Sequence, residues 1–138
     1  MSLLELTRQY HFSAGHRLES AALSPEENAR LYGQCYRQHG HNYLVEVTVA
    51  GRPDPVTGMA ADLSALDAAV RRVVLDQVDH YDLSSAVPAL RGVTTTGENL
   101  ARAFWDWLEP ALPAGSLRRV AVVETDNNTF EFRGAAAR

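Results

Sequence analysis

Residues 39–50, HGHNYLVEVTVA, combine two closely spaced histidines with the pattern of a strand. From about Gly40 to Ala50 every second residue is apolar or aromatic, and a period of two is typical of a strand with one buried face. That face is predicted to carry His41, Tyr43, Val45, Val47 and Val49.

The N-terminal residues 4–16 show the same alternation, interrupted at Arg8. The shared face is predicted to carry Leu4, Leu6, Tyr10, Phe12, Ala14 and His16. If the two strands pair as an antiparallel hairpin, His16 lies opposite the end of the second strand that holds His39 and His41.

Three helices are predicted between and beyond these strands. Ser24-Pro25-Glu26-Glu27 is typical of a helix start, and this helix should end near Leu31. Asp62 can cap a second helix that continues to about Val78. We interpret Thr95-Thr96-Gly97-Glu98 as a capping box that opens a third helix to about Leu108.

Two further strands are predicted near the C-terminus. They cover residues 120–124 and 129–133, and the turn Asp126-Asn127-Asn128 joins them as a hairpin. The chain order is thus one strand pair, a helix pair and a second strand pair. This order predicts an α+β fold, a four-stranded antiparallel sheet with the helix pair on one face.

The composition is typical of a globular domain. Of the 138 residues, 46% are hydrophobic and 22% are charged, and the formal net charge is −4. An acidic total excludes a whole-surface basic footprint for nucleic acid, and no apolar run approaches the roughly 18 residues that span a bilayer. Cys35 is the one cysteine, which excludes an intramolecular disulfide. We expect one cytoplasmic domain over residues 1–138 with no nucleic-acid or membrane partner.

The pair His39 and His41 is the first sign of chemistry. Residues i and i+2 of a strand point to the same side, so the two imidazoles should project together, about 6 to 7 Å apart along the strand. His16 is the candidate third ligand, whereas His11 has the opposite parity. Three imidazoles and one open position are the layout of a catalytic zinc site. The alternative is that these histidines are surface or polar core residues.

Cys35, Asp79, His80 and Glu124 are further candidates. Cys35 lies four residues before His39 in a polar loop, and a thiol near a dication can act as a base or nucleophile. The pair Asp79-His80 is a weak motif by itself, because adjacent residues rarely form a good hydrogen bond with each other. Glu124 ends an apolar strand face, as a rim residue or as a carboxylate held for a guanidine-like ring edge.

Taken together, these segments resemble the 6-pyruvoyl-tetrahydropterin synthases and their relatives, the 6-carboxy-tetrahydropterin synthases of the queuosine pathway. The resemblance extends from Tyr10 to Gly134. The segments that carry it are residues 12–18, Leu23–Asn28, Cys35 with His39–Tyr43, Asp54–Met59, Asp79-His80, Thr96 with Glu98-Asn99, and Glu124–Asn128.

The resemblance implies a tunnelling fold, in which trimers close a twelve-stranded barrel and two trimers stack into a homohexamer. Closure would also remove the two bare edges of an open sheet. The roles implied for single residues are zinc binding by His16, His39 and His41, proton abstraction by Cys35, relay from Asp79 and His80 across a subunit boundary, and anchoring of the pterin ring by Glu124 with help from Thr96.

The implied activity is that of a lyase acting on 7,8-dihydroneopterin triphosphate. Loss of triphosphate and internal redox would give 6-pyruvoyl-tetrahydropterin, with Zn²⁺ as the cofactor. The basic residues available for the triphosphate are Arg17, Arg30 and Arg37, which the sequence does not assign.

One spacing departs from the pyruvoyl-forming pattern. Those enzymes usually place five residues between the cysteine and the first histidine of the pair, whereas this chain has three, Tyr36-Arg37-Gln38. Three is the spacing of the carboxy-forming relatives, which release acetaldehyde. The segments Leu23–Asn28, Asp54–Met59 and Glu124–Asn128 favour the pyruvoyl former. A non-catalytic pterin- or purine-binding module and a structural zinc protein remain as alternatives.

Overall fold

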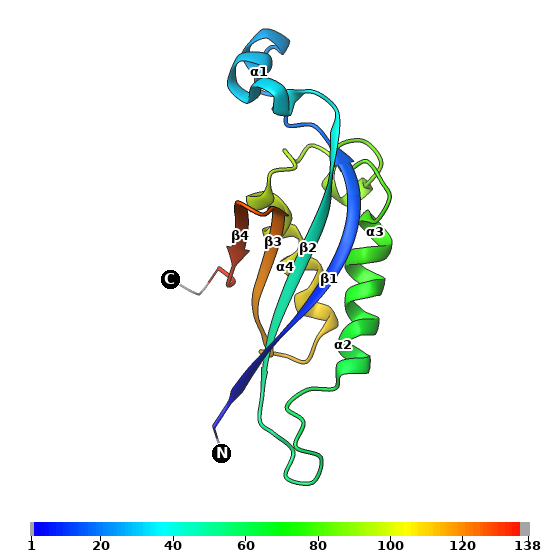
Figure 1. The fold of residues 1–138 in the computed structure, drawn as a ribbon, viewed down its shortest axis with the longest axis vertical. Coiled ribbons are helices and arrows are strands. Elements are labelled where there is room, and N and C mark those ends of the chain that lie inside the picture. Colours follow the sequence, from blue (N-terminus) through cyan, green and yellow to red (C-terminus); the bar gives the residue numbers. More distant parts are fainter. Residues whose placement is uncertain (1, 136–138) are drawn as a thin grey trace.

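The computed structural model describes residues 2–135, and its centre is one antiparallel sheet (Figure 1). The strands are β1 (Leu4–His16), β2 (His39–Gly51), β3 (Leu117–Thr125) and β4 (Asn128–Phe132), paired in the order β1-β2-β3-β4. The predicted four-stranded sheet and the α+β class are therefore confirmed.

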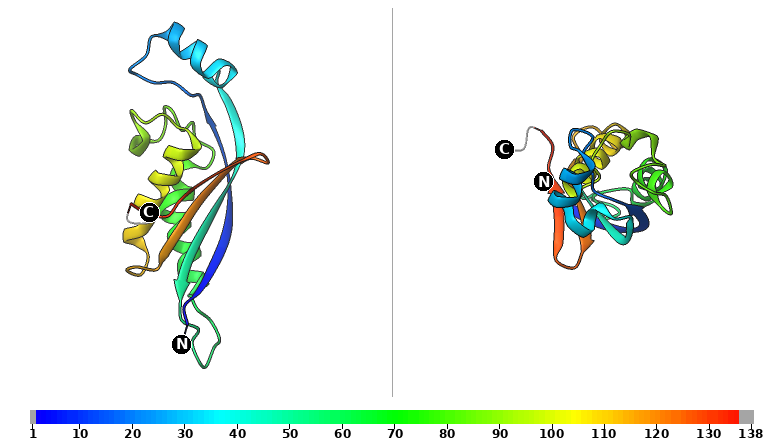
Figure 2. Two further views of the ribbon diagram at one scale, coloured as in Figure 1. Left: turned by 90° about the vertical axis from the view of Figure 1, so that its left-hand side faces the viewer. Right: turned by 90° about the horizontal axis from the view of Figure 1, so that it is seen from above.

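The helices are α1 (Pro25–Tyr32), α2 (Leu63–Val70), α3 (Asp76–Val78) and α4 (Gly97–Leu108). The side view shows α2, α3 and α4 on one face of the sheet, whereas α1 projects beyond the end where β1 finishes and β2 begins (Figure 2). No helix among residues 2–135 is both long enough and apolar enough to cross a bilayer.

The pairing of β1 with β2 puts the predicted apolar positions on the helix-covered face. Phe12 lies opposite Tyr43, Ala14 opposite His41, and His16 opposite His39. The Phe12 and Tyr43 rings stack with centroids 4.7 Å apart, and Phe104 of α4 meets the edge of Phe12 at 5.9 Å. These three aromatic side chains join the sheet to α4 and lead from the core towards the histidines.

The predicted helix from Asp62 to Val78 is continuous but not α-helical throughout. Asp62 caps it by accepting a hydrogen bond from the Ala65 N–H at 3.0 Å. Residues Arg71–Leu75 form a π-helical turn between α2 and α3. A π turn holds one residue more than an α turn, and such turns often occur near functional sites.

The start of α4 differs in detail from the predicted capping box. Thr96 is the N-cap, and its hydroxyl accepts from the Asn99 N–H at 3.3 Å. Glu98 is one position too early to return a hydrogen bond to the cap, because the third helical residue is Asn99, whose amide donates to the Thr94 carbonyl instead. The box at Ser24 and Glu27 is present as predicted.

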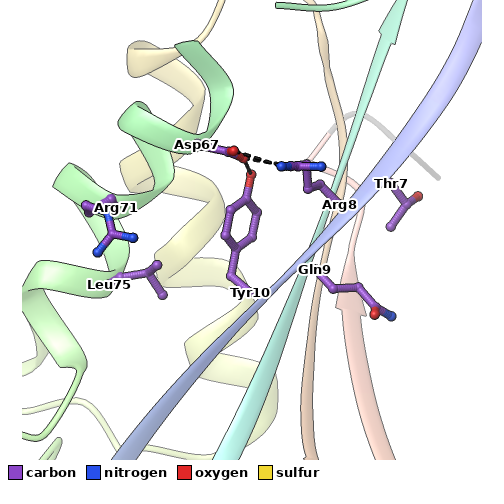
Figure 3. A pocket seen from close by; sticks show the side chains of 7 residues that line it. All are labelled: Thr7, Arg8, Gln9, Tyr10, Asp67, Arg71 and Leu75. Carbon is purple, nitrogen blue, oxygen red and sulfur yellow. Dashed lines mark hydrogen bonds and ion pairs between the residues drawn. The ribbon is translucent and has the colours of Figure 1, made fainter. Parts of the chain in front are cut away.

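The interruption at Arg8 is explained by a contact between β1 and α2 (Figure 3). The Arg8 guanidinium donates two hydrogen bonds to the Asp67 carboxylate, at 2.7 and 2.9 Å, and the Tyr10 hydroxyl donates a third at 2.7 Å. These donors lower the pKa of Asp67 to about 2, while burial and the same carboxylate raise the pKa of Tyr10. The charged residue on the apolar face thus fastens the edge strand to the helix.

Replacing Asp67 by Asn should weaken this fastening. The amide oxygen can still accept from Tyr10, but the charge that holds Arg8 is gone. Because the Asp67 side chain is 39% exposed, we expect a loss of about 1 kcal/mol in the free energy of unfolding at pH 7. The folded pKa is below the ordinary 3.8, so this contribution is present above pH 3.8 and disappears as the pH falls towards 2.

Urea denaturation at pH 7 and pH 3 measures both effects. The control is Asp76→Asn, which removes an exposed carboxylate from the same continuous helix. If Asp67→Asn costs no more than Asp76→Asn at pH 7, the three hydrogen bonds do not stabilise the fold.

Candidate metal centre and active site

Three histidines from β1 and β2 converge at one end of the sheet. The ring centroids of His16, His39 and His41 lie 4.5 to 5.1 Å apart, and their nearest ligand atoms lie within 4.8 Å of one another. The His39 and His41 ring centroids are 4.8 Å apart, closer than the about 6 to 7 Å expected from the strand rise. The predicted triad is thus assembled within one chain, and His11 on the opposite face takes no part in it.

Hydrogen bonds to backbone carbonyls orient two of the three rings. His16 Nδ1 lies 3.0 Å from the Thr95 carbonyl oxygen, and His39 Nδ1 lies 2.7 Å from that of Arg37. A carbonyl oxygen can only accept, so each Nδ1 carries the hydrogen. In the neutral ring this tautomer leaves Nε2 as the lone-pair donor, the state in which a histidine binds a metal ion.

The environment also keeps two of these imidazoles neutral. Burial, reinforced by the neighbouring His39, lowers the pKa of His16 from 6.5 to about 4. Burial likewise lowers the pKa of His41, although the negative charge of Glu124 opposes the shift. At neutral pH no proton competes with a metal ion for His16. A donor set of three imidazole nitrogens fits zinc, which is commonly bound by histidine in proteins.

The sequence does not identify two residues of this centre. Thr95 is buried and holds His16 through both its carbonyl and its hydroxyl, the latter at 3.2 Å from Nδ1. The Tyr43 hydroxyl donates to His16 Nε2 at 3.3 Å, and burial raises the pKa of this phenol. Tyr43 was predicted only as part of an apolar face, and nothing in the local sequence marks Thr95 as a partner of a residue 79 positions earlier.

Cys35 lies outside the histidine triad. It is exposed in the 3₁₀ turn Gly33–Tyr36, and its backbone carbonyl accepts from the Leu18 N–H at 2.8 Å. Next to it, the Arg17 guanidinium lies over the Tyr36 ring, 4.9 Å from the centroid. The thiol is therefore at the surface beside the metal-binding end of the sheet, on a turn that is tied to the segment after β1.

Asp79 and His80 lie in contact with each other. His80 Nδ1 is 2.9 Å from Asp79 Oδ1, and His80 has a left-handed backbone conformation with φ of 66°. Asp79 Oδ1 also accepts from the Ser13 N–H at 3.0 Å. Among residues 2–135, neither member of this pair makes a hydrogen bond or ion pair with Cys35 or with the triad.

Glu124 acts on the triad through its charge, whereas Thr96 is next to a residue that contacts the triad. Glu124 is half-buried near the end of β3. Its negative charge adds to the rise that burial causes in the pKa of Tyr43. The same charge opposes the larger effect of burial, which lowers the pKa of His41. The carboxylate therefore acts on the triad electrostatically. Thr96 caps α4, and its neighbour Thr95 is the residue that contacts His16.

The low pKa of His16 makes the stability of the metal-free protein depend on pH. Between pH 6.5 and about 4 the unfolded chain binds a proton that the folded chain does not, so the free energy of unfolding falls as the pH decreases through this window. We expect a loss of about 2 kcal/mol from His16 between pH 7.5 and pH 5. Urea denaturation in the presence of a chelator measures it. The His16→Asn variant should lack this part of the slope; equal slopes in the two proteins would contradict the assignment.

Comparisons with known proteins agree on one family. The family model described as 6-pyruvoyl tetrahydropterin synthase matches residues 5–135. The 6-pyruvoyl tetrahydrobiopterin synthase of Poecilia reticulata is 46% identical over 131 residues, which cover 94% of this chain and 89% of the relative. The 6-carboxy-5,6,7,8-tetrahydropterin synthase of Aquifex aeolicus is 28% identical over 158 residues, covering 94% of this chain and 97% of that protein.

The fold comparison gives the same result. The structure of Caenorhabditis elegans 6-pyruvoyl tetrahydropterin synthase superposes with a TM-score of 0.92 at 36% identity, and the match covers 98% of each chain. The chain belongs to the 6-pyruvoyl tetrahydropterin synthase family.

Proposed function

We propose that this chain is a zinc-dependent lyase that converts 7,8-dihydroneopterin triphosphate into 6-pyruvoyl-tetrahydropterin with loss of triphosphate. The observation that carries the proposal is the convergence of three imidazoles, in a chain of this family that has an exposed thiol four residues before the second of them. An exposed free thiol supports the enzyme over a binding module, because pterin binding alone needs no base.

The metal ligands in this proposal are His16, His39 and His41. When bound, a zinc ion supplies Lewis acidity to the hydroxyl oxygens of the substrate side chain and makes the adjacent carbon-bound protons easier to remove. The chain contributes pre-oriented ligands, since Thr95 and Arg37 hold two of the rings before any ion arrives.

Cys35 is the proposed base, and Asp79 with His80 the proposed relay. His80 Nδ1 lies 2.9 Å from Asp79 Oδ1, and Nε2 is the ring nitrogen that the carboxylate does not engage. The His80 side chain is 82% exposed and makes no hydrogen bond or ion pair with Cys35 of its own chain, among residues 2–135. Such a relay suits a thiol that belongs to another subunit.

Glu124 is the proposed anchor of the pterin ring. A carboxylate accepts two parallel hydrogen bonds from a guanidine-like edge, and Glu124 lies within electrostatic range of the triad. Thr96 is the proposed second contact of the ring. Arg17, whose guanidinium lies over the Tyr36 ring, pairs with Glu19 at 2.8 Å, and it is one candidate for the triphosphate.

The proposed assembly is a homohexamer made of two trimers. The outer edges of the sheet belong to β1 and β4. Pairing of these edges between copies would satisfy their free backbone groups and close a barrel. The same assembly would bring His80 of one subunit towards Cys35 of the next.

The second candidate is the 6-carboxy-tetrahydropterin synthase reaction, which uses the same substrate. The three-residue spacing between Cys35 and His39 favours it. The higher identity to the pyruvoyl-forming relative, 46% against 28%, favours the first candidate. Mass analysis of the product decides, because only the carboxy-forming reaction releases acetaldehyde.

Metal removal and Cys35→Ala test the enzyme directly. Chelation should abolish turnover of 7,8-dihydroneopterin triphosphate, and added zinc should restore it. Cys35→Ala should lower kcat about 10²- to 10⁴-fold, the range for loss of a general base. Because Cys35 is exposed and outside the triad, the variant should keep its melting temperature and one zinc per chain.

Two outcomes would reject this proposal. Turnover that survives complete removal of the metal would exclude the zinc-dependent reaction. Unfolding or loss of zinc in Cys35→Ala would instead indicate a structural zinc protein. The control is His11→Ala, an exposed histidine on the opposite face of β1, which should keep both zinc and activity.

Complementation tests whether the site is shared between subunits. Cys35→Ala and His80→Ala should each be inactive alone. In mixed oligomers made by co-expression, about a quarter of the sites would combine an intact Cys35 with an intact His80, so about a quarter of the parental activity should return. Mixed oligomers without activity would place the relay within one chain or exclude His80 from the reaction.

A further inference from the structure

The loop between Cys35 and His39 is held at several points. The Cys35 carbonyl is tied to Leu18, and the Arg37 carbonyl accepts from His39 Nδ1. The Arg37 N–H donates to the Gln34 carbonyl at 3.0 Å. These contacts all involve the backbone of the loop, and Gln38 adds the one hydrogen bond from a loop side chain that spans to another segment among residues 2–135.

The partner of Gln38 is Asp82, 44 positions later. The Gln38 amide donates a hydrogen bond from Nε2 to Asp82 Oδ2. The other carboxylate oxygen, Oδ1, accepts from the Ser84 N–H at 2.8 Å and the Ser85 N–H at 3.1 Å. One oxygen of the Asp82 carboxylate is therefore held by the backbone that follows it, and the other oxygen accepts from the loop.

Asp82 is also fixed to β1 at Gly15. Gly15 N–H donates to the Tyr81 carbonyl at 3.1 Å, and Leu83 N–H donates to the Gly15 carbonyl at 2.8 Å, so Asp82 pairs with Gly15 as a short parallel bridge. Gly15 is adjacent to His16. The position of Asp82 is thus tied by backbone hydrogen bonds to a proposed metal ligand.

Gly15 leaves the space that this contact occupies. A Cβ atom at Gly15 would lie 3.1 Å from Gln38 Nε2 and 3.5 Å from Asp82 Oδ2. A side chain there would press on the amide and the carboxylate together. The hydrogen bond therefore crosses β1 directly above a residue that has no side chain.

We propose that Gln38 and Asp82 form a clamp that positions Cys35 against the metal centre, which makes them positioning residues for the proposed reaction. This inference rests on the proposed function. Cys35 sits on a short exposed turn, whereas His16 sits on a strand. The clamp joins the two, and a displacement of about 1 Å in a reacting group can cost about 10²-fold in rate. Asp82 also follows Asp79 and His80 closely, so the clamp ties the thiol loop to the relay segment.

Gln38→Glu breaks the clamp by placing two carboxylates against each other. Gln38 is exposed, so the fold should be unaffected. We expect kcat to fall about 10- to 100-fold with KM nearly unchanged, because the thiol is misplaced while the metal and ring contacts remain. The zinc content per chain should equal that of the parent.

The double variant Gln38→Glu/Asp82→Asn reverses the direction of the hydrogen bond. The amide introduced at position 82 can keep its oxygen for the Ser84 and Ser85 N–H groups, while its nitrogen donates to the carboxylate introduced at position 38. We expect kcat to return to within about threefold of the parent, since one neutral-to-charged hydrogen bond replaces another. The matched control is Gln34→Glu, which adds the same charge to the same loop without facing Asp82.

A second readout does not depend on turnover. The rate at which iodoacetamide alkylates Cys35 in the zinc-loaded, substrate-free protein should shift in Gln38→Glu and return in the double variant. If the parent does not turn over the substrate, the proposed function fails, and this rate still tests the clamp. The clamp is overturned if Gln38→Glu behaves as the parent does, if the double variant is no better than the single one, or if Gln34→Glu has the same effect.

Discussion

The antiparallel register of β1 and β2 is the constraint on which both the core and the metal centre depend. It sets Phe12 against Tyr43 and, four residues further along β1, His16 against His39. The stacked rings of Phe12 and Tyr43 are buried under α4, so the register is specified by apolar packing. A slip of one residue would turn His16 to the opposite face together with Phe12, and packing energy therefore maintains the ligand geometry.

This arrangement places a polar site directly on top of a hydrophobic core. Tyr43 belongs to both, since its ring packs on Phe12 and its hydroxyl reaches His16. Burial lowers the proton affinity of His16, and the Thr95 carbonyl satisfies its N–H. The apolar surroundings thus prepare the imidazole for a cation, because they exclude the proton that would compete for the same nitrogen.

The sequence predicted those parts of the fold and site that follow from local periodicity. The alternation in residues 4–16 and 40–50 predicted both strands, and parity alone selected His16 over His11. Contacts between distant segments could not be predicted from the sequence, because no local pattern links Gln38 to Asp82 or His16 to Thr95. The left-handed conformation of His80, a residue that is not glycine, also has no signal in the local sequence. The π turn could not be predicted either, because its apolar residues continue the apolar face that the sequence predicts for a regular α-helix.

The π turn at Arg71–Leu75 has an implication for how this chain tolerates changes in length. The turn stores one surplus residue in the middle of the long helix. Because the turn already absorbs this residue, deleting one residue within it would let the helix close into regular α geometry while the residues that follow keep their face. Val78 would remain in the core, and Asp79 would remain near the Ser13 amide. The same deletion in the regular helix α4 would rotate the residues after it by about 100°. Natural variants that lack one residue should therefore be found at the π turn, or in the connections around the helix such as residues 52–61.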